Sequence, residues 1–287
     1  MEATDATKDE HRARSNFVRE LVQRRRVDDR LTAAAATRPP RTIVQFWDDP
    51  NSLPADVGDC MESWRLLTEQ GIALTLFDYH SARDFIAQRL SARHVGAYNK
   101  CYHPAMQSDY FRLCYLFVEG GCYVDADDVY NGRPIDHLFE DGRLKIQPLC
   151  YDTSTDQMIC PRVFTEPAAD APTWIFYFNN NPLIAMRGHP IIRRALMSAT
   201  RDLERATPDR LPEIQSTTGP GRLTKSIFDD CTQRSDIADT LIVLGNWEDI
   251  ATSKWPLSYR HDARNWRLSN QRPYRRLASG DHDGDQK

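Results

Sequence analysis

The chain has 287 residues and a formal net charge of −4, because 41 Asp and Glu residues slightly outnumber 37 Lys and Arg residues. Its hydrophobic fraction of 40% is typical of a globular protein with a substantial core. The near-neutral balance argues against a general binder of nucleic acids or anionic membranes. No stretch approaches the roughly 18 consecutive apolar residues of a transmembrane helix, so the sequence predicts no membrane-spanning segment.

The seven cysteines are irregularly spaced and none belongs to a CxxC pair. This spacing indicates neither a disulfide framework nor a zinc finger, and it favours buried, reduced thiols. Residues 1–10 are acidic and polar and lack the apolar core of a secretory signal. We therefore expect a cytoplasmic protein. Peripheral contact with a membrane, or secretion as an effector without a cleaved signal, are the alternatives.

Three segments follow from the composition along the chain. The composition of residues 1–41 predicts a polar helical arm. Phe17 and Leu21 would share one face of its helix, and its many charged residues favour exposure to solvent. Residues 42–278 are expected to form the folded domain. The polar end of the chain, residues 279–287, is expected to be a disordered tail.

Strands and helices are expected to alternate within the first half of the domain. Strands are predicted at residues 42–47, 73–77 and 122–127. Helices are predicted at residues 54–69, from the capping Ser81 to 90, and at 104–119. This alternation is typical of an α/β domain with a largely parallel sheet. The second half is less regular, with strands expected at 144–149, 174–178, 183–186 and 241–244, and helices at 191–205 and 222–231.

The most informative stretch is SDYFRLCYLFVEGGCYVDADD, at residues 108–128. Residues 110–118 are almost wholly apolar, which predicts a deeply buried helix. Ser108 and Asp109 share a helical face with Arg112, because Arg112 follows them by four and three positions. Burying a carboxylate and a guanidinium is costly unless they pair with each other or bind something. The glycine pair then ends the helix and allows a sharp turn into a strand.

Two carboxylates follow on the expected strand. Asp125 and Asp127 are two positions apart, so strand alternation would point both to one side, whereas Asp128 would point away or begin a loop. A hard divalent cation, Mn²⁺ or Mg²⁺, would relieve their repulsion and keep open positions for phosphate oxygens. Arg112 would share in stabilising such a diphosphate at the carboxyl end of the strand. The DxD tripeptide alone is also compatible with an ordinary acidic turn.

The complete pattern resembles the glycosyltransferases with a sugar-binding region containing the DXD motif. These include family 32 enzymes related to yeast Golgi mannosyltransferases, bacterial capsule-type transferases and clostridial glucosylating toxins. Their pattern is roughly SDxxRxxxLxxxGGxYxDxD, and this chain matches each defined position. The resemblance covers about residues 42–266 and is strongest over 105–128. Weaker matches are Gln45 and Trp47 in the opening strand, Ser63–Trp64, the N…GHP segment at 180–190 and the TGP at 218–220.

The resemblance implies a GT-A-like, Rossmann-like α/β fold with a mixed central sheet, a nucleotide-sugar donor, a divalent metal and retention of the anomeric configuration. The catalytic residues that it implies are Asp109, Arg112, Asp125 and Asp127. The donor-binding residues that it implies are Gln45, Phe46, Trp47, Ser108, Asp109, Arg112, Tyr123, Asp125, Asn180, His261 and Trp266. The metal ligands that it implies are Asp127, Asp125 and Asn265.

The C-terminal part departs from the family pattern. Many members end with an H-x-W-x-x-S-W-like segment that closes over the donor, and here residues 259–266 (YRHDARNW) take its place. His261 and Trp266 match, but the serine and the first tryptophan are absent. Six arginines fall between residues 260 and 276, against one acid, Asp262. Such a segment could clamp a diphosphate, or it could be a solvated basic edge.

We therefore expect a metal-dependent, retaining glycosyltransferase. It would move a hexose from a UDP- or GDP-sugar to a glycan, lipid-linked or protein acceptor, with polysaccharide biosynthesis as the commonest setting, and it would bind no nucleic acid. Three alternatives stay open. The chain could be a toxin-like effector that glycosylates a host protein, a non-catalytic sugar-nucleotide-binding or scaffold protein, or a metal-dependent phosphohydrolase.

Overall fold

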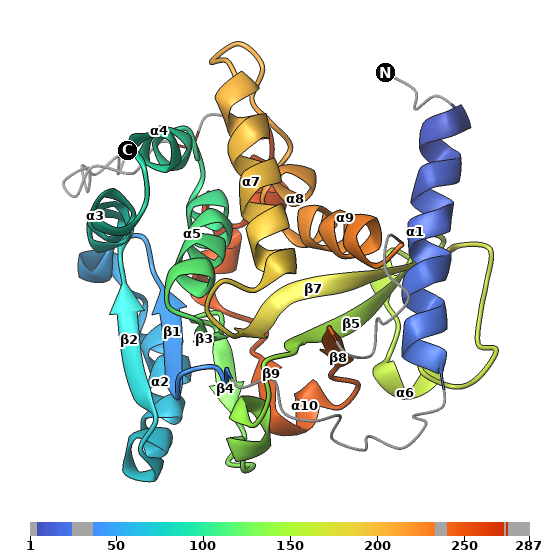
Figure 1. Ribbon diagram of the computed structural model, residues 1–287, viewed down its shortest axis with the longest axis horizontal. Coiled ribbons are helices and arrows are strands. Elements are labelled where there is room, and N and C mark those ends of the chain that lie inside the picture. The colour runs from blue at the N-terminus through green and yellow to red at the C-terminus, as the bar shows by residue number, and fades with distance from the viewer. Residues whose placement is uncertain (1–4, 25–36, 233–239, 273, 275–287) are drawn as a thin grey trace, which may run out of the picture.

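The computed structural model describes residues 5–24, 37–232, 240–272 and 274, so the predicted tail lies outside the described residues. A mixed sheet runs through the molecule, with most of the helices gathered along one side of it (Figure 1). The strands are β1 Thr42–Phe46, β2 Ala73–Phe77, β3 Gly121–Tyr123, β4 Asp128–Tyr130, β5 Leu144–Asp152, β6 Gln157–Met158, β7 Trp174–Ala185, β8 Leu241–Val243 and β9 Ala251–Ser253. The helices are α1 Asp5–Gln23, α2 Ala55–Ser63, α3 Tyr79–Arg89, α4 Ala92–Asn99, α5 Pro104–Val118, α6 Pro161–Phe164, α7 Pro190–Arg205, α8 Ile214–Thr217, α9 Pro220–Cys231, α10 Trp247–Ile250 and α11 Trp266–Ser269. The 3₁₀ helices are η1 Pro50–Ser52, η2 Trp64–Gln70, η3 Asp136–Phe139 and η5 Ser258–His261.

The central sheet has the strand order β2-β1-β3-β7-β5-β6, and β8 pairs with β5. Strand β1 is parallel to both β2 and β3, as expected for strands joined through helices. Strand β7 then runs antiparallel to β3 and to β5. The sheet is therefore mixed, and the prediction of an α/β fold with a mixed central sheet is confirmed.

The two faces of the sheet are both covered, because alternate residues of its strands enter different apolar clusters. Val44 and Tyr123 pack with the helical layer that contains α5 and α7. Their neighbours Ile43 and Cys122 pack on the opposite face, around Trp64. Strands that are buried on both faces explain the nearly continuous apolar runs that the sequence shows at these positions.

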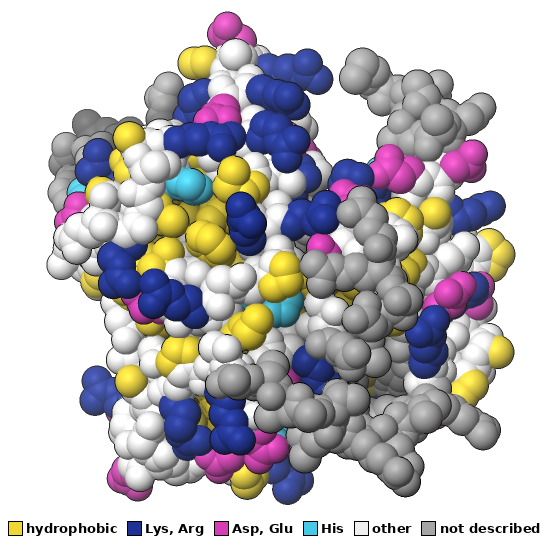
Figure 2. Space-filling model, viewed as in Figure 1, with side chains coloured by type: hydrophobic (Ala, Val, Ile, Leu, Met, Phe, Trp, Pro, Cys, Tyr) yellow, Lys and Arg dark blue, Asp and Glu magenta, His cyan; other side chains and the backbone are white. Residues whose placement is uncertain are grey.

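Helix α7 illustrates how the sequence pattern orients the helical layer. Its buried residues Ile192, Leu196, Ala199 and Leu203 recur at intervals of three and four, which is the spacing of one helical face. Lys and Arg side chains gather over this helix in the space-filling view (Figure 2). The helix thus separates the core from a basic outer surface.

The prediction that the N-terminal helix is a solvated arm is wrong. Helix α1 packs beside β7 and α9, at the edge of the sheet (Figure 1). Val18 is fully buried, and the Ser15 hydroxyl accepts a hydrogen bond of 2.9 Å from the backbone N–H of Phe176. The apolar positions next to Phe17 were therefore the stronger signal, because they are numerous enough to bury one side of a charged helix.

Several predicted boundaries also shift. The predicted helix at 54–69 divides into α2 and η2, and the two late strands at 174–178 and 183–186 are one strand, β7. Helix α3 begins after Asp78, which is its N-cap, whereas Ser81 is the third residue of the helix and completes the capping box. The predicted strand at 122–127 ends at Tyr123, which places the two DxD carboxylates in the following turn.

Candidate active site

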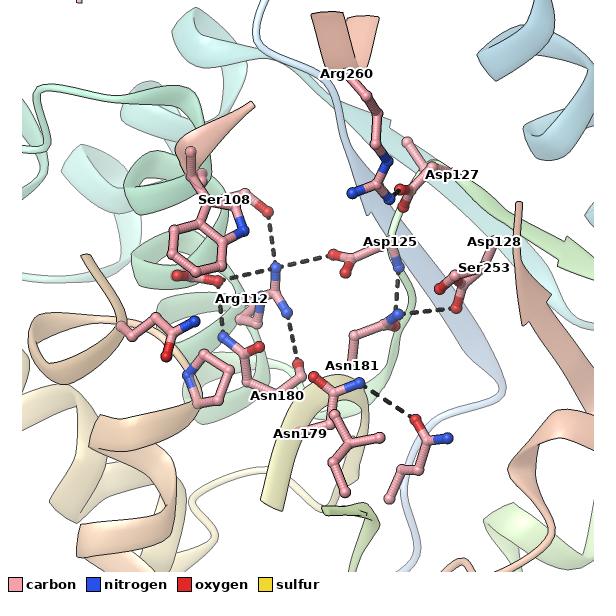
Figure 3. A pocket seen from close by; sticks show the side chains of 18 of the residues that line it. Ser108, Arg112, Asp125, Asp127, Asp128, Asn179, Asn180, Asn181, Ser253 and Arg260 are labelled. Carbon is pink, nitrogen blue, oxygen red and sulfur yellow. Dashed lines mark hydrogen bonds and ion pairs between the residues drawn. The ribbon is translucent and has the colours of Figure 1, made fainter. Parts of the chain in front are cut away.

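A cavity of about 570 Å³ opens beyond the carboxyl ends of β1 and β3. Its walls come from the end of β1, the first half of α5, the DxD turn, the middle of β5 and β7, and the C-terminal segment from β9 to Arg267. Ligands bind at such edges in α/β sheets because the loops that follow the strands diverge there. Figure 3 shows the polar residues that face one another across this cavity.

Arg112 is the centre of the polar network and is 3% exposed. Its guanidinium donates to the backbone oxygen of Asn180 (2.6 Å), to the Ser108 hydroxyl (3.0 Å) and to a carboxylate oxygen of Asp125 (2.9 Å). It also lies 3.1 Å from Asp109 and stacks over the Tyr123 ring at 4.2 Å. This pairing removes most of the cost of burying the charges that the sequence predicts on α5.

Asp109 connects α5 to the loop before α9. Its carboxylate accepts hydrogen bonds from the Asn180 amide (2.7 Å) and from the Thr218 hydroxyl (3.4 Å). Burial raises the pKa of Asp109, and the neighbouring Arg112 cation opposes that rise. The TGP sequence therefore has a structural reason, because Thr218 donates to Asp109 and Gly219 lets the loop approach it closely.

We expect Gly219→Ala to destabilise the protein by about 1–3 kcal/mol, the usual cost of overpacking. A Cβ at this position would lie 3.0 Å from Cα of Gln215 and 3.2 Å from an oxygen of Asp109. Urea denaturation measures the effect. Gly96→Ala is the matched control, because nothing lies within 4 Å of its added methyl group and alanine favours helix α4. Equal stabilities for the two variants would contradict this packing argument.

The DxD carboxylates are brought together by a turn rather than by strand alternation. Asp125 and Asp127 both line the cavity, between the ends of β3 and β4. Burial raises the pKa of Asp125 to about 6; the Arg112 cation opposes the rise and the Asp127 charge adds to it. The shared orientation was thus predicted for the wrong reason.

Asp128 lies beside this pair as the first residue of β4. Its two oxygens accept hydrogen bonds from the Ser253 hydroxyl (2.6 Å) and from the Asn181 amide (2.8 Å). The same Asn181 side chain accepts a bond of 3.0 Å from the backbone N–H of Asp125, so it holds the turn from both sides (Figure 3). Burial, followed by repulsion from Asp127 and Asp125, raises the pKa of Asp128 to about 7.

We expect the metal-free protein to melt at a higher temperature at pH 6 than at pH 8. The pKa of Asp128 is raised from 3.8 to about 7, so the folded state binds a proton between these values that the unfolded state lacks. Stability from this group therefore falls as the pH rises through about 7. Asp128→Asn keeps the shape without the charge and should flatten this dependence. Thermal melts in EDTA test this, and an unchanged dependence in the variant would place the titrating group elsewhere.

The C-terminal segment closes over the DxD turn. Strand β9 pairs with β4, so Ser253 lies opposite Asp128. Beyond it, Tyr259 donates a bond of 2.8 Å to Asp127 Oδ2, and Arg260 forms an ion pair with the same oxygen. Arg264 pairs with Asp48 at 3.2 Å. Arg260 and Arg264 of the arginine-rich segment are therefore part of the site and not a solvated edge.

The acidic residues of the DxD turn suit a divalent cation whose remaining ligands come from substrate phosphates. No group of three or more His, Cys, Asp or Glu side chains that could hold a metal ion is found among the described residues. Mg²⁺ is commonly bound by one or two carboxylates and completed by substrate phosphates, and Asp125 and Asp127 provide such a pair. The Asn265 amide oxygen caps α11 through the backbone N–H of Arg267, so it would have to ligate a metal with its second lone pair.

The structure brings most of the predicted site residues together. Those that line the cavity are Phe46, Trp47, Ser108, Asp109, Arg112, Asp125, Asp127, Asn180, Asn265 and Trp266. Gln45 and Tyr123 are buried behind it, where Gln45 donates to the backbone oxygen of Asp125 (3.4 Å) and the Tyr123 hydroxyl lies 2.6 Å from that of Ser108. His261 is exposed and is not among the lining residues.

Sequence reasoning missed several contributors to the site, among them Asn181, Tyr259 and Arg260. Asn181 belongs to an unusual run of three asparagines, residues 179–181, inside an otherwise apolar strand, and this run is a signal that the sequence offers. Tyr259 and Arg260 directly precede the expected His261, but only the pairing of β9 with β4 brings them to Asp127.

Several buried polar atoms of the cavity wall lack a hydrogen-bond partner among the described residues. These atoms are Trp47 Nε1, Asp48 Oδ2, Arg112 Nε and Arg260 Nε. Buried polar groups are nearly always paired, so a cluster of orphaned donors marks a place where a polar ligand would be bound. Three of the four atoms are N–H donors, which suits an acceptor-rich ligand.

One comparison with known proteins covers part of this site. Residues 54–144 match the family model described as glycosyltransferase sugar-binding region containing DXD motif. No curated protein matches the chain. A solved structure titled "PaToxG Glycosyltransferase" is similar over 81% of each chain, with 15% sequence identity and a TM-score of 0.47. The matched range contains α5, the glycine turn and the DxD carboxylates, so this part of the chain is similar to the DXD-containing sugar-binding region of glycosyltransferases.

Proposed function

We propose that this protein transfers a hexose from a UDP- or GDP-sugar, with retention of the anomeric configuration, to a glycan, lipid-linked or protein acceptor. The observation that carries the proposal is the buried Arg112 beside the DxD turn, at the edge of the sheet where a cavity opens. A guanidinium and carboxylates placed together suit a donor that has both a diphosphate and sugar hydroxyls.

Different residues of the cavity are proposed to bind different parts of the nucleotide-sugar donor. Phe46 and Trp47 lie at the end of β1, where they are proposed to contact the base and ribose. Asp109 and Asp125 are the proposed acceptors for sugar and ribose hydroxyls, and Arg112 is the proposed donor to the diphosphate. Asn180 fixes Asp109 and its backbone oxygen fixes Arg112, which supports a preorganised site.

Asp127 and Asp125 are the proposed ligands of Mn²⁺ or Mg²⁺. A bound cation would neutralise charge on the departing diphosphate. The chain's own contribution is to hold Arg112 in place with four acceptors, so that no reorganisation is needed when charge develops. No helix in the described part of the chain is long and apolar enough to cross a bilayer.

Donor hydrolysis tests the proposal. Purified protein is incubated with a panel of UDP- and GDP-sugars and Mn²⁺, and the released nucleotide is measured. Slow release from one donor, abolished by EDTA, is expected. If no donor of the panel releases its nucleotide and no nucleotide shifts the melting temperature, the proposal is contradicted. Nucleotide binding without turnover would favour the non-catalytic alternative, and equal cleavage of nucleotides without a sugar would favour a phosphohydrolase.

A further inference from the structure

The carboxylate of Asp127 is already occupied by groups of this chain. Its Oδ2 atom accepts the Tyr259 hydroxyl at 2.8 Å and is paired with Arg260. The side chains of Asp127 and Arg260 are only 11% and 13% exposed, so this ion pair is largely shielded from water. The position expected to attract a divalent cation therefore holds a guanidinium.

We propose that Arg260 is a placeholder cation: it neutralises Asp127 in the donor-free protein, a divalent cation displaces it, and the freed guanidinium then binds the donor diphosphate. This inference rests on the proposed function. It assigns Arg260, which the sequence pattern does not single out, a place in donor binding and a role in controlling metal affinity.

The charge balance of the cavity favours displacement over permanent replacement of the metal. Six acidic residues line the cavity, and four arginines face them. The acidic residues are Asp48, Asp109, Asp125, Asp127, Asp128 and Glu248, and the arginines are Arg112, Arg260, Arg264 and Arg267. When all six carboxylates are ionised, a diphosphate would add further negative charge to this excess of two. An additional cation is therefore needed before the donor binds well, and Arg260 alone does not supply it.

The anchoring of the segment allows the Arg260 side chain to move while the backbone stays in place. The backbone N–H and hydroxyl of Ser258 donate to Asp56 at 2.7 and 2.9 Å. On the other side, Arg264 donates to Asp48 and to the Ser52 hydroxyl. Between these anchors, Arg260 Nε has no hydrogen-bond partner among the described residues, so it keeps a free donor for a phosphate oxygen.

Trp255 provides a second contact for the guanidinium. Arg260 Cζ lies 3.8 Å from the centroid of the Trp255 ring, which is 58% exposed and lines the cavity. Such a cation–π contact attracts the charge without saturating its N–H donors. Movement of Arg260 away from Asp127 should therefore change the surroundings of this indole.

The test is Mn²⁺ binding to the donor-free protein, measured by calorimetry, followed by UDP or GDP binding at saturating Mn²⁺. Arg260→Gln is expected to bind Mn²⁺ about tenfold more tightly than wild type, because the metal no longer competes with the guanidinium. The same variant should bind the nucleotide about tenfold more weakly, because a charge-assisted hydrogen bond is lost. A purely structural role for Arg260 would not move the two affinities in opposite directions.

Arg267→Gln is the matched control. Arg267 lines the same cavity and stacks over Trp266, but it makes no contact with Asp127, so its removal takes away the same charge without freeing the carboxylate. The control should tighten Mn²⁺ binding much less. Mn²⁺ should also change the tryptophan emission of wild type, and the change should be smaller in Trp255→Phe, in which the other tryptophans of the cavity remain.

Two outcomes would overturn the placeholder role. One is equal Mn²⁺ affinity in wild type, Arg260→Gln and Arg267→Gln; the other is tighter Mn²⁺ binding together with unchanged nucleotide affinity. The proposed function stands after either outcome if wild type still hydrolyses a nucleotide sugar in the presence of Mn²⁺. Failure of every donor in the hydrolysis panel, in contrast, would reject the proposed function whatever the metal affinities are.

Discussion

Asp127→Asn is expected to lower donor hydrolysis by at least about a hundredfold, the scale of losing one preorganised electrostatic contact at a reacting group. Asp127 is the carboxylate of the DxD turn that is paired with Arg260 and Tyr259, and it is the proposed primary ligand of the divalent cation. The asparagine keeps the shape and removes the charge that would hold the cation. Release of UDP or GDP with Mn²⁺ present measures the loss.

The variant must be shown to be folded, because Asp127 also neutralises Arg260. Asparagine can still accept from Tyr259, so we expect urea denaturation to show a much smaller change than the activity does. Asp59→Asn is the matched control, since it makes the same chemical change at an exposed position outside the cavity. Full activity of Asp127→Asn with metal and donor present would remove Asp127 from the proposed mechanism.

Helix α5 and its ends could be predicted from the sequence because the signals there are local. A proline stands at its first position, an apolar run fills it, and Gly120 and Gly121 follow. Both glycines have positive φ, and a Cβ on Gly120 would lie 2.6 Å from the backbone nitrogen of Arg187. Local backbone requirements of this kind can be predicted from the residue types alone, because glycine adopts positive φ without strain.

The full site could not be predicted, because its second half depends on strand pairing between distant segments. Asn181 reaches Asp125 and Asp128 only because β7 lies antiparallel beside β3, with Leu183 opposite Tyr123. Arg260 reaches Asp127 only because β9 pairs with β4. Neither pairing has a local sequence signature, since β3, β4 and β9 are three residues each.

The misplaced strand end at 122–127 has a related cause. The alternation of apolar and acidic residues in CYVDAD is compatible with a strand, but the turn is fixed by side chains from elsewhere, namely Asn181 and the β9 residue Ser253. Tertiary hydrogen bonds of this kind override strand propensity. Both DxD carboxylates nevertheless lie at one cavity, because the turn gathers them there in place of the predicted strand alternation.

Arg112→Ala is expected to have the largest effect on stability, about 3–5 kcal/mol, because it breaks a buried ion pair and leaves carboxylates uncompensated. Asp109 and Asp125 would lose their shared cation, and the Ser108 hydroxyl and the backbone oxygen of Asn180 would lose their donor. Urea denaturation measures the change. Arg193→Ala, at an exposed position of α7, is the control and should stay within about 0.5 kcal/mol of wild type.

The same substitution separates a structural from a donor-binding role. Under conditions where Arg112→Ala is still folded, nucleotide binding should weaken by about 1.5–3 kcal/mol, the scale of a charge-assisted hydrogen bond. Arg112→Lys restores the charge, but an ammonium cannot reproduce the planar fork that reaches Ser108, Asn180 and Asp125 together. We therefore expect lysine to recover only part of the stability and affinity. An unchanged calorimetric affinity for the nucleotide in Arg112→Ala would make Arg112 a structural residue, and the donor diphosphate would then have to be bound by Arg260 and the metal alone.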